Sequence, residues 1–331
     1  MNKKYVSILL AVFFILTACG NQGAVTSKDS KTEGNASEEV ASNEAKDSGN
    51  ENKTQTITYL GKEYTVPAKV EKIVAASQEA MEDAAILGVK PVGAIAAAGK
   101  FPEYLGDSMS EAIEIGDKKQ PNSEVLLQLK PDVILGTSKF QPEVVKNLNS
   151  VAPMIPISHI STNWKDNLLV LAELSGKKEE AEQIIKQYEA DAAEVKKQLA
   201  SSMKDKKVLM VRIRGGNIFI YSQDVYFNPV LYSDLGLTVP KEILASQSQE
   251  MITLEKLAEI NPDYLFVQFE ESENAQTPEA LKDLQNNTIW KSIQAVKSDK
   301  VFINTVSPLA AGGTALSKTE FLKVVKEKLV E

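Results

Sequence analysis

Cysteine and histidine are almost absent from this chain, which has one of each, Cys19 and His159, among 331 residues. A single cysteine cannot form an internal disulfide, and one cysteine with one histidine cannot make a zinc site of the usual kind. No glycine-rich dinucleotide fingerprint or phosphate-binding loop follows a predicted strand. The formal net charge of -8 argues against a nucleic-acid binder. These absences argue against a disulfide-stabilised domain, a protein with an ordinary zinc site, an enzyme with a dinucleotide or phosphate-binding loop, and a nucleic-acid binder.

The scarcity of histidine also bears on catalysis. His159 could activate a serine only if a His-Ser-Asp arrangement were assembled around the loop in which it lies. A polar loop residue, near the junction between the two lobes predicted below, is the simpler interpretation. The sequence offers no other activated nucleophile. We therefore expect a binding protein rather than an enzyme, and a lipid-anchored α/β enzyme is the alternative.

Long apolar runs are missing except at the start of the chain. Lys3 and Lys4 precede an apolar run, 5–16, that is too short to span a bilayer permanently and is typical of a secretory signal. Small residues lead into Cys19, so the segment resembles a bacterial lipobox, in which the cysteine is lipidated and becomes the new N-terminus after cleavage. The alternative is an ordinary signal peptide with an incidental cysteine. We expect a signal peptide at 1–18 and a lipid anchor at Cys19, which places the protein on the extracellular face of the cell membrane.

Large aliphatic residues are scarce in the next segment, 19–55, which contains only Val25 and Val40. Such a composition cannot bury enough apolar area to offset the entropy of ordering the chain. We expect a disordered tether here. The residues that follow are numerous enough for two domains of ordinary size.

Two segments of this remaining part resemble each other. Residues 123–135 and 254–266 each contain a helical pattern, a Pro-Asp pair and an apolar run. Apolar runs that alternate with helical patterns predict parallel sheets covered by helices. The periodicity of 163–201 predicts a long helical stretch, interrupted at Ser175-Gly176. We expect lobes at 56–160 and 187–331, bridged by a helix at 161–186. The alternative to a bridge is two ordinary surface helices of the second lobe.

The order of these features resembles that of the iron-siderophore substrate-binding lipoproteins of bacterial ABC importers, of Gram-positive type. The features are the lipobox, the polar tether, the strand at 72–74, the segment 129–134, the connecting helix and the repeat at 260–263. The resemblance implies a class III periplasmic-binding-protein fold: α/β, with two Rossmann-like lobes bridged by one long α-helix and a ligand cleft between them. It implies a monomer that binds a ferric siderophore without an intrinsic cofactor, the iron being held by the siderophore. The implied partner is an ABC permease dimer with its cytoplasmic ATPase. A catecholate siderophore, heme and cobalamin are alternative ligands for the same fold.

The strongest candidate for ligand binding is the pair Arg212 and Arg214, which directly follows an apolar run that we expect to be a strand. Alternate positions on a strand send both side chains to the same face, and strand ends carry the ligand-contacting loops of α/β folds. Guanidinium groups suit carboxylate oxygens because they can donate two hydrogen bonds to one carboxylate. The resemblance adds that receptors for carboxylate and citrate-hydroxamate siderophores carry an R-x-R motif here, so we favour that class. The alternative is that both arginines pair with acidic side chains of their own lobe.

Other candidates lie at strand ends or at the expected lobe junction, and surface or core packing explains each of them equally well. Lys118 occupies a loop in which the family often carries an arginine. The full set of weaker ligand candidates is Ser77, Lys100, Lys118, Lys139, Trp164 and Tyr221.

Glu124 and Glu255 occupy equivalent positions in the two repeats, near the start of a short helical pattern. A carboxylate there complements the helix macrodipole, which by itself explains the residue. The resemblance implies a second role, because family members dock onto their permease through one glutamate per lobe. We expect these two residues to be the docking pair.

Overall fold

The computed structural model describes residues 53–96 and 99–330, which belong to one compact unit. The predicted signal peptide, Cys19 and nearly all of the predicted tether lie outside the described residues. Thr54 and Gln55, which we expected in the tether, belong instead to the first strand. None of the helices in the described part of the chain is long and apolar enough to cross a membrane.

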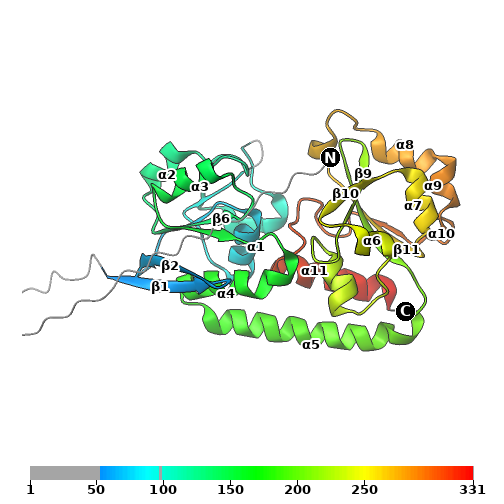
Figure 1. Ribbon diagram of the computed structural model, residues 1–331, viewed down its shortest axis with the longest axis horizontal. Coiled ribbons are helices and arrows are strands. Elements are labelled where there is room, and N and C mark those ends of the chain that lie inside the picture. Colours follow the sequence, from blue (N-terminus) through cyan, green and yellow to red (C-terminus); the bar gives the residue numbers. More distant parts are fainter. Residues whose placement is uncertain (1–52, 97–98, 331) are drawn as a thin grey trace, which may run out of the picture. The chain divides into compact units, whose positions relative to one another are not determined.

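The N-terminal lobe begins with an antiparallel hairpin and continues as a five-stranded parallel sheet in the order β5-β4-β3-β6-β7 (Figure 1). Its central strand β3 and the neighbouring β6 are buried at every position, as parallel strands covered on both faces should be. The elements of this lobe are β1 (Thr54–Tyr59), β2 (Lys62–Pro67), β3 (Ile73–Ala75), α1 (Gln78–Leu87), β4 (Gly93–Ala94), η1 (Glu103–Met109), β5 (Ile113–Glu114), α2 (Ser123–Leu129), β6 (Val133–Thr137), α3 (Pro142–Asn149) and β7 (Met154–Ile157).

The C-terminal lobe has a second five-stranded sheet, in the order β10-β9-β8-β11-β12. Its elements are β8 (Val208–Arg214), β9 (Asn217–Tyr221), the short π-helix η3 (Val230–Asp234), α6 (Lys241–Ala245), β10 (Gln249–Ile252), α7 (Leu254–Ile260), β11 (Tyr264–Phe269), η4 (Glu271–Asn274), α8 (Ala280–Asn286), α9 (Thr288–Ser292), α10 (Gln294–Lys297), β12 (Val301–Ile303) and α11 (Ala315–Leu329). The α/β class and the two lobes predicted from the sequence are confirmed.

The expectation of a fully parallel second sheet was wrong. Strand β9 runs antiparallel to both β8 and β10. The cause is the two-residue turn Gly215-Gly216, in which both residues have positive φ, 53° and 75°. Such a turn joins neighbouring antiparallel strands, whereas a parallel connection needs a crossover of about a dozen residues or more.

The internal repeat is confirmed, and its Pro-Asp pair has a physical role. Helices α2 and α7 both end at a non-glycine residue in the left-handed conformation, Lys130 and Asn261. The aspartate that follows then accepts a hydrogen bond from the backbone just before the central strand of its own sheet. Asp132 Oδ2 accepts from Lys72 N at 2.8 Å, and Asp263 Oδ2 accepts from Lys207 N at 2.8 Å. Each repeat therefore ties a helix end to the central strand of its own sheet.

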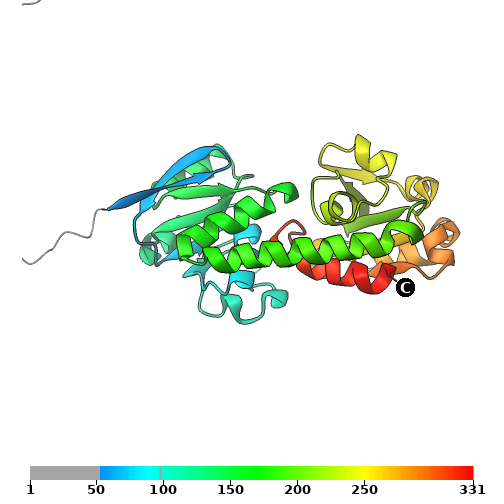
Figure 2. The same ribbon diagram turned by 90° about the horizontal axis from the view of Figure 1, so that it is seen from below.

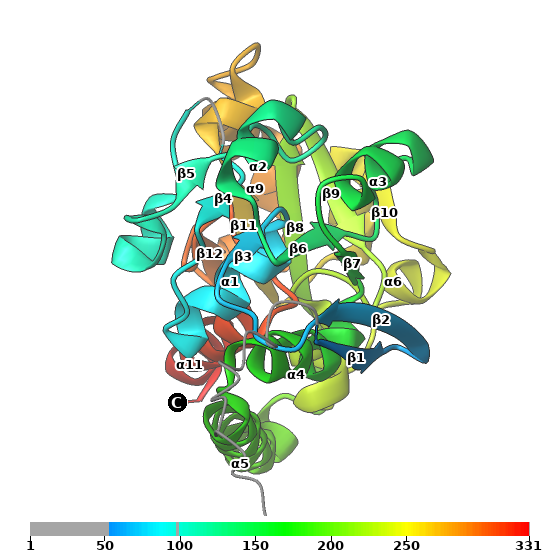
Figure 3. The ribbon, with the colours of Figure 1, turned by 90° about the vertical axis from the view of Figure 1, so that its left-hand side faces the viewer.

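The long helix lies later in the chain than predicted. The stretch expected as one helix at 161–186 is divided into η2 (Ser161–Asn163), α4 (Trp164–Ser175) and the start of α5 (Lys178–Ser202). Gly176 ends α4 in the left-handed conformation, with φ 70°. The 25 residues of α5 span about 37 Å at about 1.5 Å per residue. This helix runs along both lobes (Figure 2), and it lies with α4 on one side of the sheets (Figure 3).

The two lobes also meet through a buried carboxylate. Glu82, on α1 of the first lobe, is fully buried and accepts four hydrogen bonds. Its Oε1 accepts from the Tyr104 hydroxyl at 2.5 Å and from the backbone N–H of Ala311 at 2.6 Å. Its Oε2 accepts from the hydroxyls of Thr314 and Ser317, at the start of α11. We call Glu82 and these four donors the Glu82 junction.

Candidate ligand-binding cleft

A cavity of about 510 Å³ is lined by residues of both lobes. The first lobe contributes residues after the carboxyl ends of β3 and β6, including Ser77 and Lys139, and the second lobe contributes Arg212 and Arg214 of β8. The carboxyl ends of parallel strands are where α/β sheets place their ligands. The cavity is therefore the candidate binding cleft.

The charges in this cleft are unequal. Five cationic side chains line it, against two carboxylates, Glu79 and Glu273, which leaves a formal charge of +3 when His159 is neutral. The cations are Lys118, Lys119, Lys139, Arg212 and Arg214. A positive cleft in a protein of formal charge -8 favours an anionic ligand over a neutral or cationic one.

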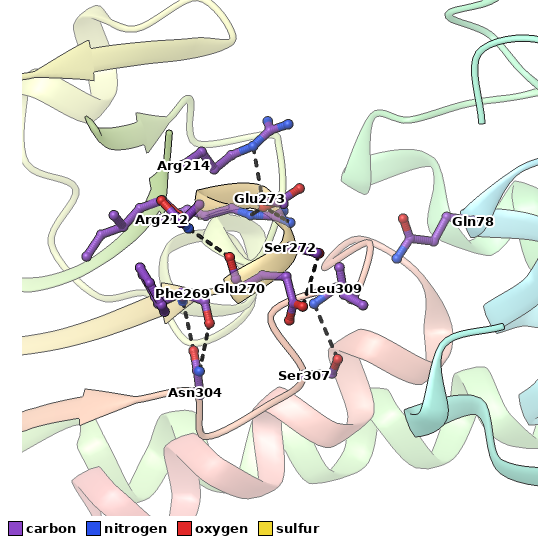
Figure 4. A network of polar contacts seen from close by, with 12 residues as sticks. Gln78, Arg212, Arg214, Phe269, Glu270, Ser272, Glu273, Asn304, Ser307 and Leu309 are labelled. Carbon is purple, nitrogen blue, oxygen red and sulfur yellow. Dashed lines mark hydrogen bonds and ion pairs between the residues drawn. The ribbon is translucent and has the colours of Figure 1, made fainter. Parts of the chain in front are cut away.

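Both arginines contact one carboxylate, that of Glu273 on η4 (Figure 4). The Arg212 Nε donates to Glu273 Oε2 at 3.0 Å, and Arg212 Nη2 lies 2.8 Å from the same oxygen. Arg214 Nε lies 3.4 Å from that oxygen. The predicted shared face of the two arginines is therefore confirmed, and so is the alternative that both pair with an acid of their own lobe. The pair lines the cleft in spite of these contacts.

The position of Glu273 is fixed by its neighbour Asn274, which is fully buried. The Asn274 Nδ2 donates to Ile213 O at 3.0 Å and to Glu270 O at 2.8 Å, and its Oδ1 accepts from Gly216 N at 3.0 Å. These bonds join η4 to the end of β8 and to the turn that follows it. The two arginines and Glu273 are thus held by the same buried amide.

Tyr226 packs against Arg212. The Arg212 guanidinium lies 5.4 Å from the centre of the Tyr226 ring, a favourable cation–π distance. The ring also packs against Tyr221, with ring centres 4.7 Å apart. Burial raises the pKa of both tyrosines, so both phenols stay neutral and can only donate or accept hydrogen bonds. The aromatic pair gives the cleft an apolar surface next to its charges.

The first lobe supplies a more exposed cationic wall. Burial lowers the pKa of Lys118, and the positive charges of Arg214 and Arg212 lower it further, while the carboxylate of Glu273 opposes them. The carboxylate of Glu273 therefore interacts electrostatically with Lys118 on the opposite lobe. Burial and the neighbouring Lys139 also lower the pKa of His159, which keeps the imidazole neutral at pH 7. The His159 Nδ1 lies 2.9 Å from the Ser138 hydroxyl.

Six of the predicted ligand residues line this cleft, and two do not. Trp164 is buried beneath the lobe junction, where its ring packs edge-on against Tyr188 and lies 5.6 Å from Lys318 Nζ. This placement contradicts the prediction that Trp164 contacts the ligand. Lys100 is exposed outside the cleft. The residues that the structure brings together are Ser77, Lys118, Lys139, Arg212, Arg214 and Tyr221.

Sequence reasoning missed several residues of the cleft. Glu273 lies in the acidic segment 270–273, which reads as a solvated loop. Gln78 and Glu79 directly follow the predicted Ser77, so their position just after the end of a strand could have indicated that they line the cleft. Ala310 and Ala311, from the loop that precedes α11, also line the cleft. No group of three metal-ligating side chains exists within residues 53–96 and 99–330.

The two predicted docking glutamates are exposed on α2 and α7. Asn122 caps α2 by accepting from Glu124 N at 2.9 Å, and Thr253 caps α7 by accepting from Lys256 N at 3.1 Å. The backbone N–H of Glu255 and the Thr253 hydroxyl lower the pKa of Glu255, so this carboxylate does take part in the cap. The helix-capping interpretation thus gains support at Glu255.

Comparison with known proteins places these features in context. A family model described as periplasmic binding protein matches residues 73–305. The iron-uptake system-binding protein of Bacillus subtilis strain 168 is 47% identical over 332 residues, which cover 99% of this chain and 99% of that protein. The probable siderophore-binding lipoprotein YfiY of the same organism is 28% identical over 343 residues, covering 97% of this chain and 99% of its own.

A solved structure gives a match with bound ligand. The triscatecholate siderophore binding protein FeuA from Bacillus subtilis, complexed with ferri-bacillibactin, superposes with a TM-score of 0.80. It is 50% identical, and the match covers 83% of this chain and 98% of that chain.

Proposed function

This chain belongs to the periplasmic binding protein family, and from that premise we propose that it is an extracytoplasmic receptor that binds a ferric siderophore and delivers it to an ABC permease for iron uptake. It is a binding protein and not an enzyme. The observation that carries the proposal is the cleft between the two lobes, with its excess of cationic side chains beside an aromatic surface. The similarity to iron-uptake and siderophore-binding proteins over nearly the whole chain supports it.

Within the siderophores, we propose a ferric triscatecholate. Sequence analysis favours a citrate-hydroxamate or carboxylate ligand, with catecholate as an alternative, and the likeness to FeuA with ferri-bacillibactin supports the alternative instead. Three catecholates supply six deprotonated oxygens to Fe³⁺, which makes the chelate a trianion. The formal charge of +3 in the cleft matches that charge, and Tyr221 and Tyr226 add aromatic lining near the arginines that can contact the catechol rings.

The arginine pair should supply much of the affinity in this proposal. The hydrogen bonds of a charged group are each worth about 1.5–3 kcal/mol. In Arg212→Ala with Arg214→Ala, at least one such bond per arginine is lost, and Glu273 is left as an unpaired anion in the cleft. We therefore expect the double variant to lose at least about 100-fold in affinity, since about 1.4 kcal/mol corresponds to a factor of ten.

The test is a calorimetric titration of the full chain with ferric bacillibactin, a ferric citrate-hydroxamate and a neutral ferric trihydroxamate. The matched control is Lys323→Ala, which removes an exposed cation on α11 that does not line the cleft. Submicromolar binding of the triscatecholate, lost in the arginine variant and kept in the control, is the expected result. Failure of the wild-type chain to bind any ferric chelate would overturn the proposed function. Preferred binding of the citrate-hydroxamate would overturn only the ligand class.

We also propose that Cys19 carries a lipid that holds the receptor on the extracellular face of the cell membrane. The lipobox-like sequence supports this, as does the match to a probable lipoprotein over 97% of the chain. For docking onto a dimeric permease we propose Glu124 and Glu255. They stand at equivalent positions of the internal repeat, are exposed, and come from different lobes (Figure 1).

A further inference from the structure

The cleft contains a carboxylate that opposes its own ligand. A receptor for a trianion gains attraction from every cation in the cleft and loses some of it to every anion. Glu273 is nevertheless held between the two arginines, with its side chain only 13% exposed. Its position is set by the buried Asn274 and not by chance surface pairing. The arrangement has a consequence for which ligands the cleft accepts.

Glu273 occupies the edge of Arg212 that a ligand carboxylate would otherwise use. The two nitrogens Nε and Nη2 of Arg212 both face Glu273 Oε2, at 3.0 and 2.8 Å. That edge is one of the sides on which a guanidinium binds a carboxylate with two hydrogen bonds. A ligand that carries a single carboxylate must compete with a partner that belongs to the same lobe and is always present. Such a ligand gains little by replacing it.

A highly charged ligand is in a different position. It can use the remaining N–H groups of both guanidiniums, and it also interacts with the lysines that line the opposite wall, Lys118, Lys119 and Lys139. Its attraction to the net charge of the cleft grows with its own charge. Glu273 reduces that attraction in proportion but does not cancel it, because five cations stand against two carboxylates.

We propose that Glu273 is a built-in competitor anion that lowers the affinity of the cleft for every anionic ligand, more so the higher the charge of the ligand, and thereby sets how steeply affinity rises with ligand charge. This inference rests on the proposed function and names the residue that determines its charge specificity. Citrate and phosphate are the small anions that would otherwise meet two free guanidiniums. With Glu273 present, they meet an arginine pair that is already neutralised in part.

The test is Glu273→Gln, which keeps the shape of the side chain and removes its charge. The added attraction should be about twofold in affinity per ligand charge, for water-like screening over about 8 Å. A trianion should therefore gain about tenfold, while a neutral chelate should not change. The gain should shrink at high salt, because the Debye length falls to about 3 Å at about 1 M. A role in positioning the arginines alone would not produce this dependence on ligand charge.

The matched control is Glu271→Gln, an exposed glutamate on the same short helix that does not line the cleft and changes the total charge equally. The full chain is titrated with ferric bacillibactin, citrate, inorganic phosphate and a neutral ferric trihydroxamate at low and high salt. A gain in Glu273→Gln that increases with ligand charge, absent in the control, is expected. Equal loss of affinity for all ligands would mean that Glu273 only positions the arginines and would overturn the inference. In that case wild-type binding of the chelate leaves the proposed function standing.

Discussion

Removal of the Glu82 carboxylate should destabilise the folded protein strongly, because this buried group accepts hydrogen bonds from both lobes. It is fully buried and accepts from Tyr104 of its own lobe and from three donors of the other lobe, Ala311, Thr314 and Ser317. In Glu82→Ala the backbone N–H of Ala311 loses its acceptor. The hydroxyls of Thr314 and Ser317 also lose the acceptor of their O–H groups, although each still accepts a hydrogen bond from a backbone N–H near the start of α11.

The magnitude follows from two opposing contributions. Four hydrogen bonds to a charged group are worth about 6–12 kcal/mol in total at about 1.5–3 kcal/mol each. Against this, removing the carboxylate also removes the cost of keeping it out of water, which is several kcal/mol. Burial raises the pKa of Glu82 in spite of its four donors, so that cost is considerable. The net loss for Glu82→Ala should be about 3–5 kcal/mol, the difference between these two contributions.

Glu82→Gln separates charge from shape. Its amide can donate to the hydroxyls of Thr314 and Ser317, which can rotate to accept, while its oxygen still accepts from Ala311. We expect a loss of about 1–2 kcal/mol for this variant. Each kcal/mol should lower the melting temperature by about 2–4 °C in a domain of this size.

Urea unfolding and thermal melting of both variants measure the effect, with Glu182→Ala, an exposed glutamate on α5, as the control. The control should stay within about 0.5 kcal/mol of wild type, as surface substitutions do. If Glu82→Ala loses less than about 1 kcal/mol, or no more than Glu82→Gln, the Glu82 junction does not hold the lobes together. The alanine variant should also bind its ligand less tightly, because Ala311 lines the cleft.

Two further predictions concern docking and pH. The double variant Glu124→Ala with Glu255→Ala should lose most iron uptake by cells, while its siderophore affinity and melting temperature stay near wild type. The control is the exposed pair Glu143→Ala with Glu259→Ala, which should leave uptake intact. A loss of uptake in step with a loss of stability would favour helix capping instead. Burial and nearby carboxylates raise the pKa of Asp83, so the folded protein holds a proton that the unfolded chain releases above its pKa of about 4. The free energy of unfolding should therefore fall as the pH rises from the pKa of the unfolded chain through the raised pKa of the folded protein, by about 1.4 kcal/mol per pKa unit of difference. Asp83→Asn should flatten this part of the profile of urea midpoint against pH. An unchanged profile would contradict the assignment.

The parts of the fold that local sequence determines could be predicted. The repeat was visible because each copy carries its own helix end and its own Pro-Asp pair, and the aspartates act within a few residues of a strand start in the same lobe. The direction of β9 was missed because the alternation of apolar runs with helical patterns predicts parallel strands, whereas β9 follows β8 through a hairpin that depends on the positive φ of Gly215 and Gly216. The position of the long helix depended on whether Gly176 bends or ends a helix, and its left-handed conformation ends it.

The candidate site was predictable only where one strand carries it. Arg212 and Arg214 are two residues apart on β8, so their shared face follows from strand geometry. Glu273 comes from a segment about 60 residues later, and its position depends on the packing of Asn274 against β8. Trp164 was misplaced for the same reason, since the Lys318 that packs against it lies on the last helix. A buried lysine in an amphipathic helix gives no signal in the sequence.

Glu82 and Glu273 together indicate how a stiff receptor can be selective. Glu82 meets only neutral donors and joins the lobes, while α5 runs along both of them. We expect both features to limit how far the cleft closes around a ligand. A cleft that closes little cannot select its ligand by rearranging around it, so its selectivity must be present before the ligand arrives. The fixed charges of the cleft are suited to that task, and Glu273, held by a buried asparagine against two arginines, adjusts their sum by one unit. The rigidity that Glu82 provides is therefore the condition under which the charge of Glu273 can determine specificity.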